Sequence, residues 1–146
     1  MLIARNRSAT HHYFIEERFE AGIALVGTEV KSLRDQSPSM RDGHIEIVPA
    51  GATFEAFLLG MHIAHYKHGN LANHHETRSR KLLLKKKELA VLYGAVLKQG
   101  MTIIPLELYW KNGKVKVSLG IARGKKSHDK REDLKKRAME RDQARE

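Results

Sequence analysis

Residues 102–122 read TIIPLELYWKNGKVKVSLGIA, and this segment predicts a β-hairpin. Asn112 and Gly113 form a pair that readily adopts the positive φ angles of a type I′ turn. The second arm is apolar at alternate positions, namely Val115, Val117, Leu119 and Ile121. Alternation with a period of two is typical of a strand with one buried face. The segment therefore predicts antiparallel β-structure in the second half of the chain.

Most of residues 11–64 also have the composition of β-strands. The run HYFIEERF at residues 12–19 is rich in aromatic and β-branched side chains. Residues 27–34 fit either a strand or a short helix, and their periodicity does not separate the two. Residues 85–99 carry apolar side chains at helical spacing and predict a helix that ends before Gly100. Several short antiparallel strands with one inserted helix favour a small, partly open or closed barrel, of which the oligonucleotide-binding fold is the commonest single-domain example.

Length and composition limit the classes of protein to consider. The chain has 146 residues and no cysteine, which leaves room for one domain and excludes a disulfide framework or a thiolate zinc site. No apolar run resembles a signal peptide or reaches the roughly 18 residues that span a bilayer. We therefore expect a soluble, cytoplasmic protein with no membrane partner.

The formal net charge of +10 is distributed unevenly along the chain. Residues 1–77 carry 7 basic and 9 acidic side chains, whereas residues 78–87 carry six basic and none acidic. Residues 123–146 carry 10 basic and 6 acidic side chains. Because phosphate contacts attract clustered cations, this distribution indicates a polyanionic partner such as a nucleic acid. Residues 65–81 have no periodic apolar face and predict a long exposed loop leading into the basic run.

A catalytic or metal site finds little support in the sequence. His62, His65 and His68 are three residues apart, but strand spacing would place the first two on opposite faces, and no companion carboxylate cluster is apparent. His12 and Glu16 would lie roughly 13 Å apart along a strand, too far for direct proton transfer. No phosphate-binding loop or nucleophile motif is present. We expect a non-enzymatic protein with no metal, no cofactor and no small-molecule substrate.

The segment 124–146 differs from the rest in having few aliphatic side chains. Glu132 with Lys136, and Asp133 with Arg137, are acid-before-base pairs at helical spacing, and each stabilises a helix by about 0.2–0.5 kcal/mol. That is too little to hold an isolated helix of this length in water. The sequence predicts a basic tail that is disordered alone and helical when a partner orders it.

Five collinear blocks of this sequence resemble the small protein B family, the SsrA-binding proteins of bacteria. The blocks are Asn6-Arg7, HHYFIEERFEAGIAL at 11–25, GTEVKSLR at 27–34, RSRKLLL at 78–84 and LYWKNGKVKVSLGIARGKKSHDKRE at 108–132. The resemblance covers nearly the whole chain. One departure is His74-His75-Glu76-Thr77, where the family usually has Asp-Pro ahead of its arginines.

The resemblance implies a fold and a function. The fold is a small six-stranded antiparallel barrel with flanking α-helices at residues 1–123, followed by the tail at 124–146. The function is binding the tRNA-like domain of tmRNA (SsrA RNA) and delivering it to the A site of stalled ribosomes for trans-translation. The tail would become helical on the ribosome, in the mRNA channel near the 16S rRNA decoding centre. The alternatives are a general RNA-binding or ribosomal protein of the same fold, and a histidine-dependent nuclease.

The resemblance also implies which residues contact RNA. The family's RNA-binding positions fall on Asn6, Glu20 and Leu83, and the adjacent candidates are His11, Arg78, Arg80 and Lys81. The tail motif falls on Lys125, Lys126, His128, Asp129, Lys130 and Arg131. Within it, His128 is the candidate to stack on a base of the decoding centre.

Overall fold

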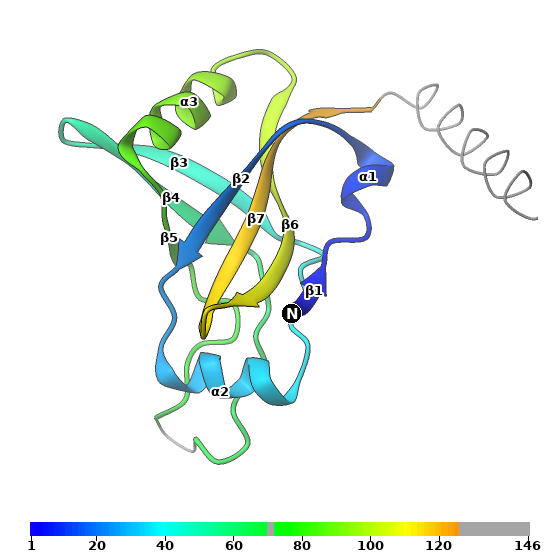
Figure 1. Cartoon of the computed structure of the whole chain (residues 1–146), viewed down its shortest axis with the longest axis vertical. Coiled ribbons are helices and arrows are strands. Elements are labelled where there is room, and N and C mark those ends of the chain that lie inside the picture. Colours follow the sequence, from blue (N-terminus) through cyan, green and yellow to red (C-terminus); the bar gives the residue numbers. More distant parts are fainter. Residues whose placement is uncertain (70–71, 126–146) are drawn as a thin grey trace, which may run out of the picture.

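Seven antiparallel strands form one sheet in the computed structural model, which describes residues 1–69 and 72–125. Their order across the sheet is β1-β6-β7-β2-β5-β4-β3 (Figure 1). The strands are β1 (Leu2–Arg5), β2 (Tyr13–Ile23), β3 (His44–Ala50), β4 (Thr53–Leu59), β5 (Arg80–Leu83), β6 (Met101–Lys111) and β7 (Lys114–Gly124). Within the described residues, no backbone pairing joins the edge strands β1 and β3, so the sheet is strongly curved but not closed.

The expected class, a mainly β fold with flanking helices, is confirmed, but the expected number of six strands is wrong. The strand easily missed from the sequence is β1, which contains only the four residues LIAR. A segment this short carries too little alternation to predict a strand. Its pairing with β6, from Leu2 opposite Tyr109 to Arg5 opposite Glu107, places the start of the chain at the sheet edge.

The predicted hairpin is confirmed as β6 and β7, with Lys111 opposite Lys114 across the turn. Asn112 has a φ angle of 51° and Gly113 one of 75°, and the left-handed region is readily accessible to these two residue types. The apolar residues of the second arm point into the core, as their alternation predicts. The hairpin thus supplies two of the three longest strands of the sheet, and the third, β2, pairs with β7.

Three helices accompany the sheet: α1 (Ala9–His12), α2 (Gly27–Asp35) and α3 (Lys86–Val96). The segment that fitted either strand or helix is α2, and its N-terminus is held by the Glu29 carboxylate, which accepts the Val26 N–H at 2.9 Å. The predicted helix at 85–99 is α3, which is shorter at both ends. Figure 1 shows α3 and α2 at opposite ends of the sheet.

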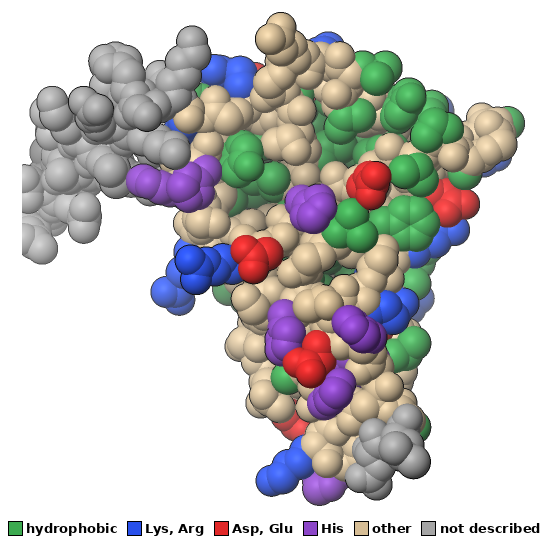
Figure 2. Space-filling model, turned by 180° about the vertical axis from the view of Figure 1, so that it is seen from behind, with side chains coloured by type: hydrophobic (Ala, Val, Ile, Leu, Met, Phe, Trp, Pro, Cys, Tyr) green, Lys and Arg blue, Asp and Glu red, His purple; other side chains and the backbone are tan. Residues whose placement is uncertain are grey.

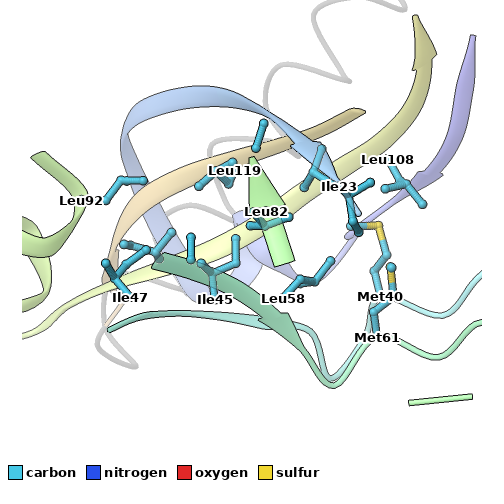
Figure 3. Packing of buried hydrophobic residues seen from close by; sticks show 14 of the residues in the cluster. Ile23, Met40, Ile45, Ile47, Leu58, Met61, Leu82, Leu92, Leu108 and Leu119 are labelled. Atoms are coloured by element: carbon cyan, nitrogen blue, oxygen red, sulfur yellow. The ribbon is translucent and has the colours of Figure 1, made fainter. Parts of the chain in front are cut away.

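The main core lies on the concave side of the sheet. Ile45, Leu58, Leu82 and Leu119 come from four different strands and meet Leu92 of α3 there (Figure 3). A smaller cluster, in which α1 contributes Ala9, contains Ile104, Leu106 and Ala122. Next to that cluster, a Cβ on Gly120 would lie 2.9 Å from Ile15 Cγ2, so glycine allows β7 to pack closely there.

The exposed loop expected at 65–81 ends earlier than predicted, because β5 begins at Arg80, whereas α3 begins at Lys86, close to its expected start. Arg80 and Leu82 of β5 point inward, whereas Lys81 and Leu83 point outward. Because the first inward position of β5 is an arginine, its sequence does not show the apolar and polar alternation typical of a strand. Residues 72–79 do form an irregular segment beside α2, where Thr28 Oγ1 lies 2.9 Å from His74 Nδ1.

Strand β7 extends through Gly124, and the Lys125 N–H then donates to the His12 carbonyl at 2.8 Å. The tail predicted at 124–146 is therefore described only at its first two residues. The expected conditional helix, and the candidates Lys126, His128, Asp129, Lys130 and Arg131, lie outside the described residues.

Candidate nucleic-acid interface

The convex face of the sheet carries a row of polar residues that crosses four neighbouring strands. Backbone pairing aligns Arg5 of β1, Glu107 of β6, Ser118 of β7 and Glu20 of β2. Strands are roughly 4.8 Å apart, so Arg5 and Glu20 lie about 14 Å apart at the two ends of this row. The N-terminal candidates and the Glu20 region therefore occupy separate parts of the sheet.

The Glu20 carboxylate is held by two side chains from β6. Tyr109 donates its hydroxyl to Oε2 at 2.5 Å, and Lys111 Nζ lies 3.1 and 3.2 Å from the two oxygens. The Tyr109 hydrogen bond, followed by that from Lys111, lowers the pKa of Glu20 below its ordinary value. Burial, and then the hydrogen bond to Glu20, raises the pKa of Tyr109 to about 12. Glu20 is therefore an oriented carboxylate that accepts hydrogen bonds at neutral pH.

Leu83 is the exposed apolar residue of this region, with 56% of its surface accessible. It pairs with Gly22 of β2, where a Cβ would lie only 3.3 Å from Leu83 Cβ. Because Gly22 has no side chain, the Leu83 side chain lies over the backbone of β2. Single exposed leucines are common on protein surfaces, so what distinguishes Leu83 is its position beside Glu20, Lys81 and Lys116.

A groove, which we call the Leu83 groove, runs beside this leucine. Its charged lining residues are Glu20, Glu55, Lys81, Lys85, Glu88 and Lys116. On the other side of Leu83 is a second hollow, which contains Trp110 and Lys114. Gly22, Leu83 and Lys116 line both, so they form the ridge between the two hollows.

Lys116 is a residue that the sequence reasoning did not select. It pairs with Gly22 across the strands, and its charge helps to lower the pKa of Glu20. The signal was present in the alternation of the hairpin, which directs Lys114 and Lys116 away from the core. What the alternation did not reveal is that β2 and β5 bring Glu20 and Leu83 to the same place.

Arg80, the first residue of β5, and Arg78, two residues before it, form an ion-pair network with Glu29 of α2. Arg80 is fully buried, and its Nε donates to Glu29 Oε2. Its terminal nitrogens donate to the carbonyls of Met61 at 2.8 Å and Glu76 at 3.0 Å. Arg78 Nη2 donates to Glu29 Oε1 at 2.5 Å, with a third of its side chain exposed. A side chain with no accessible surface does not reach an RNA, so Arg80 has a structural position here.

Burial alone would raise the pKa of Glu29, but the hydrogen bonds from Arg78, the Val26 N–H and Arg80 outweigh burial. The pKa of Glu29 consequently lies below its ordinary value. The network joins α2 to β5 and fixes the strand that carries Lys81 and Leu83. Lys81 itself is half exposed and lies 4.0 Å from Glu55.

Asn6 and His11 lie at the other end of the polar row, around α1. The Asn6 side chain donates to the Pro105 carbonyl at 2.8 Å and accepts from Ser8 Oγ at 3.0 Å. His11 packs edge-on against His12, with ring centroids 4.7 Å apart. Lys125 joins this region, since its Nζ donates to the Thr10 carbonyl at 2.7 Å. Asn6, His11 and Lys125 therefore form a second group, separate from the Leu83 groove.

The histidines gather around a carboxylate that the sequence reasoning did not pair with them. Glu76 accepts from His62 through Oε2, and its Oε1 lies 3.6 Å from His65 Nε2 (Figure 2). His74 is buried between Thr28 and the Ile63 carbonyl. The expectation that strand spacing separates His62 from His65 was wrong, because both contact Glu76, which is a single carboxylate and not a cluster. Even so, no group of three such side chains in residues 1–69 and 72–125 is arranged to hold a metal ion.

Comparison with known proteins decides the family. Residues 3–146 match the family described as SmpB protein. The chain belongs to the SmpB family. Its relatives include the SsrA-binding protein of Lactobacillus johnsonii, 50% identical over 97% of this chain and 91% of the relative. The SsrA-binding protein of Geotalea uraniireducens is 52% identical over 98% of this chain and 92% of its own length.

A solved structure agrees with this SmpB assignment. One chain of the structure described as "tmRNA-SmpB: a journey to the center of the bacterial ribosome" superposes with a TM-score of 0.68. It is 42% identical and covers 90% of this chain and 93% of its own. In the described part of this SmpB-family chain, no helix combines the length and the apolar character needed to cross a membrane.

Proposed function

We propose that this chain binds the tRNA-like domain of tmRNA and delivers it to the A site of stalled ribosomes for trans-translation. The observation that carries the proposal is the match of residues 3–146 to the SmpB family, with SsrA-binding proteins about half identical over nearly the whole chain. A neighbour in a tmRNA and ribosome structure supports the same partners. The protein acts without covalent chemistry, in the cytoplasm.

The Leu83 groove has the chemistry of a contact with an unstacked segment of RNA. Leu83 offers an apolar surface to a base, and the ammonium groups of Lys81, Lys85 and Lys116 in the groove suit phosphates. The Glu20 carboxylate suits the amino group of a base, and it would reject groups that only accept hydrogen bonds. Arg78 is partly exposed two residues before β5, and we assign it a contact at the rim of this surface.

The second group of residues extends the RNA surface towards the tail. Asn6 and His11 lie around α1, and Lys125 begins the tail motif beside them. We assign Asn6 and His11 to the RNA, and Lys125, Lys126, His128, Asp129, Lys130 and Arg131 to the ribosome. The arrangement would let one side of the protein hold tmRNA while the tail enters the mRNA channel.

The experiment is a gel-shift titration with the tRNA-like domain and with an ordinary tRNA. Lys116→Glu should weaken binding to the tRNA-like domain by about tenfold or more, since a charge-assisted hydrogen bond contributes about 1.5–3 kcal/mol. Leu83→Asp should have an effect of similar size, because it removes an apolar contact worth about 1.5–3 kcal/mol and adds a negative charge. Lys98→Glu is the matched control, because Lys98 is exposed just beyond the far end of α3. The affinity of Lys98→Glu for the tRNA-like domain should change much less than the affinities of the two groove variants.

Equal and weak binding of the wild-type protein to both RNAs would favour the alternative, a general RNA-binding or ribosomal protein. Labelled RNA should remain intact during incubation with the protein, with or without a chelator. Cleavage under these conditions would instead indicate a nuclease.

A further inference from the structure

A further basic hollow lies at the β1 end of the sheet, separate from the Leu83 groove and from the hollow that contains Trp110. Arg5, Arg7 and Arg41 line it, and we call it the arginine hollow. Arg5 and Arg7 flank the turn before α1, whereas Arg41 comes from the loop between α2 and β3. No acidic side chain among the described residues lines this hollow.

The three arginines have little internal compensation for their charge. Arg5 Nε lies 3.8 Å from Glu107 Oε1, with most of its side chain exposed. Within residues 1–69 and 72–125, neither Arg7 nor Arg41 forms an ion pair. Three guanidinium groups around one hollow repel one another, and an anion bound between them removes that repulsion.

The backbone beneath the arginines is firmly fixed. The Asn6 N–H donates to the Leu106 carbonyl at 2.8 Å, and the Asn6 side chain bonds Pro105, so the turn carrying Arg5 and Arg7 is tied to β6. On the opposite wall, the Gly43 N–H donates to the Met40 carbonyl at 2.9 Å and closes the turn around Arg41. A charged site on a fixed backbone loses little conformational freedom on binding.

We propose that Arg5, Arg7 and Arg41 form a phosphodiester-binding site for structured RNA, in addition to the Leu83 groove. Guanidinium groups match phosphate oxygens in pairs, which suits this chemistry better than a binding site for a base. Arg41 lies outside the five sequence blocks quoted above, and the fold brings it to the same hollow as Arg5 and Arg7. The proposal rests on the proposed function, and the phosphate belongs to either the tRNA-like domain or ribosomal RNA.

The test compares Arg41→Gln and Arg7→Gln with the control Lys98→Gln on two partners, the tRNA-like RNA and small ribosomal subunits. Affinity is measured over a range of salt concentrations. Losing one phosphate contact should weaken binding to one partner by about tenfold and reduce the slope of log affinity against log salt by about 0.7–0.9. The partner that responds identifies the source of the phosphate.

Unchanged affinity and salt slope for both arginine variants on both partners would overturn the arginine site while leaving the proposed function intact. Failure of the wild-type protein to prefer the tRNA-like RNA would instead overturn the proposed function, and this site with it. Arg41 is exposed, so the variants should unfold at the wild-type denaturant midpoint. An equal loss in Lys98→Gln would reduce the effect to net charge and would also refute the site.

Discussion

Arg80 is a charged side chain with no accessible surface, and Glu29 is its buried counterion. Removing one partner of a buried pair costs about 3–5 kcal/mol, because the remaining charge stays buried without compensation. We therefore expect Glu29→Gln to lower the free energy of unfolding by about that amount in a denaturant titration. The double variant Glu29→Gln, Arg80→Met should recover part of the loss. A loss below about 1 kcal/mol in the single variant would contradict the role given to this pair.

The same pair predicts a pH dependence of stability. The pKa of Glu29 is lower in the folded chain than in the unfolded chain, so its carboxylate stabilises the fold above the unfolded pKa of about 4.3. That stabilisation is lost as the pH falls through the folded pKa. The difference in unfolding free energy between the wild type and Glu29→Gln should therefore be constant near neutral pH and shrink below about pH 4.3. A difference that persists unchanged into acid would contradict this prediction.

Tyr109 is the residue that orients Glu20. In Tyr109→Phe the carboxylate loses its strongest hydrogen bond and keeps Lys111, so its pKa should rise toward the ordinary value of about 4.3. Titration of the Glu20 side chain by nuclear magnetic resonance measures this shift. Tyr93→Phe is the control, because it also removes a tyrosine hydroxyl, but from a ring that stacks on Phe54 and not from the hydrogen-bond donor of Glu20. An identical Glu20 pKa in the wild type and Tyr109→Phe would show that the hydroxyl does not hold the carboxylate.

Individual site residues were predictable from sequence only where local pattern or family motif specified them. Lys81 and Leu83 stand in a conspicuous run of cations around leucines, and the structure places both outward in one groove. Arg80 stands in the same run, yet it points inward. Its burial depends on Glu29, which is 51 residues away in sequence, and no local pattern encodes that distance.

Phe14 of β2 connects the sheet to the first residues of the tail. The Arg123 guanidinium and the Lys125 ammonium each lie 4.8 Å from the centre of its ring. Arg123 also lies 3.7 Å from Glu16. Because the Lys125 N–H bonds the His12 carbonyl, the chain leaves β7 alongside α1. The aromatic ring is thus part of the connection that sets where the tail begins.

Replacement of this ring should loosen that connection. An exposed cation–π contact contributes about 0.5–1 kcal/mol, so Phe14→Leu should speed hydrogen exchange of the Lys125 amide by about fivefold. Phe14→Tyr keeps the ring and should leave the exchange rate close to that of the wild type. If both variants exchanged equally fast, the cation–π contacts would contribute nothing measurable to this connection.

Among the secondary-structure elements, those with self-contained signals were the predictable ones. The hairpin β6–β7 has its turn residues and alternation within 21 residues, and it forms as expected. By contrast, β5 is only four residues long and includes an inward arginine. The segment that became α2 was ambiguous, because its N-terminal Glu29 serves both the helix and the buried arginines.

Across the whole molecule, the basic character is divided among several surfaces rather than spread evenly. The Leu83 groove lies where β2 and β5 meet, and the arginine hollow lies at the β1 edge, with the base of the tail beside α1. The local charge count pointed to residues 78–87, which include Lys81 and Lys85 of the groove, but not to the hollow. Arg5 and Arg7 are neighbours in sequence, but Arg41 is distant from both, and only the fold brings the loop before β3 beside them.

The most direct test of the central claim is a competition titration with the wild-type protein bound to a labelled tRNA-like domain of tmRNA. We predict that unlabelled tRNA-like domain displaces the label at stoichiometric concentrations, whereas ordinary tRNA requires at least about a hundredfold more, a difference of about 2.7 kcal/mol. Displacement by both RNAs at similar concentrations would contradict tmRNA recognition and leave a general RNA-binding protein.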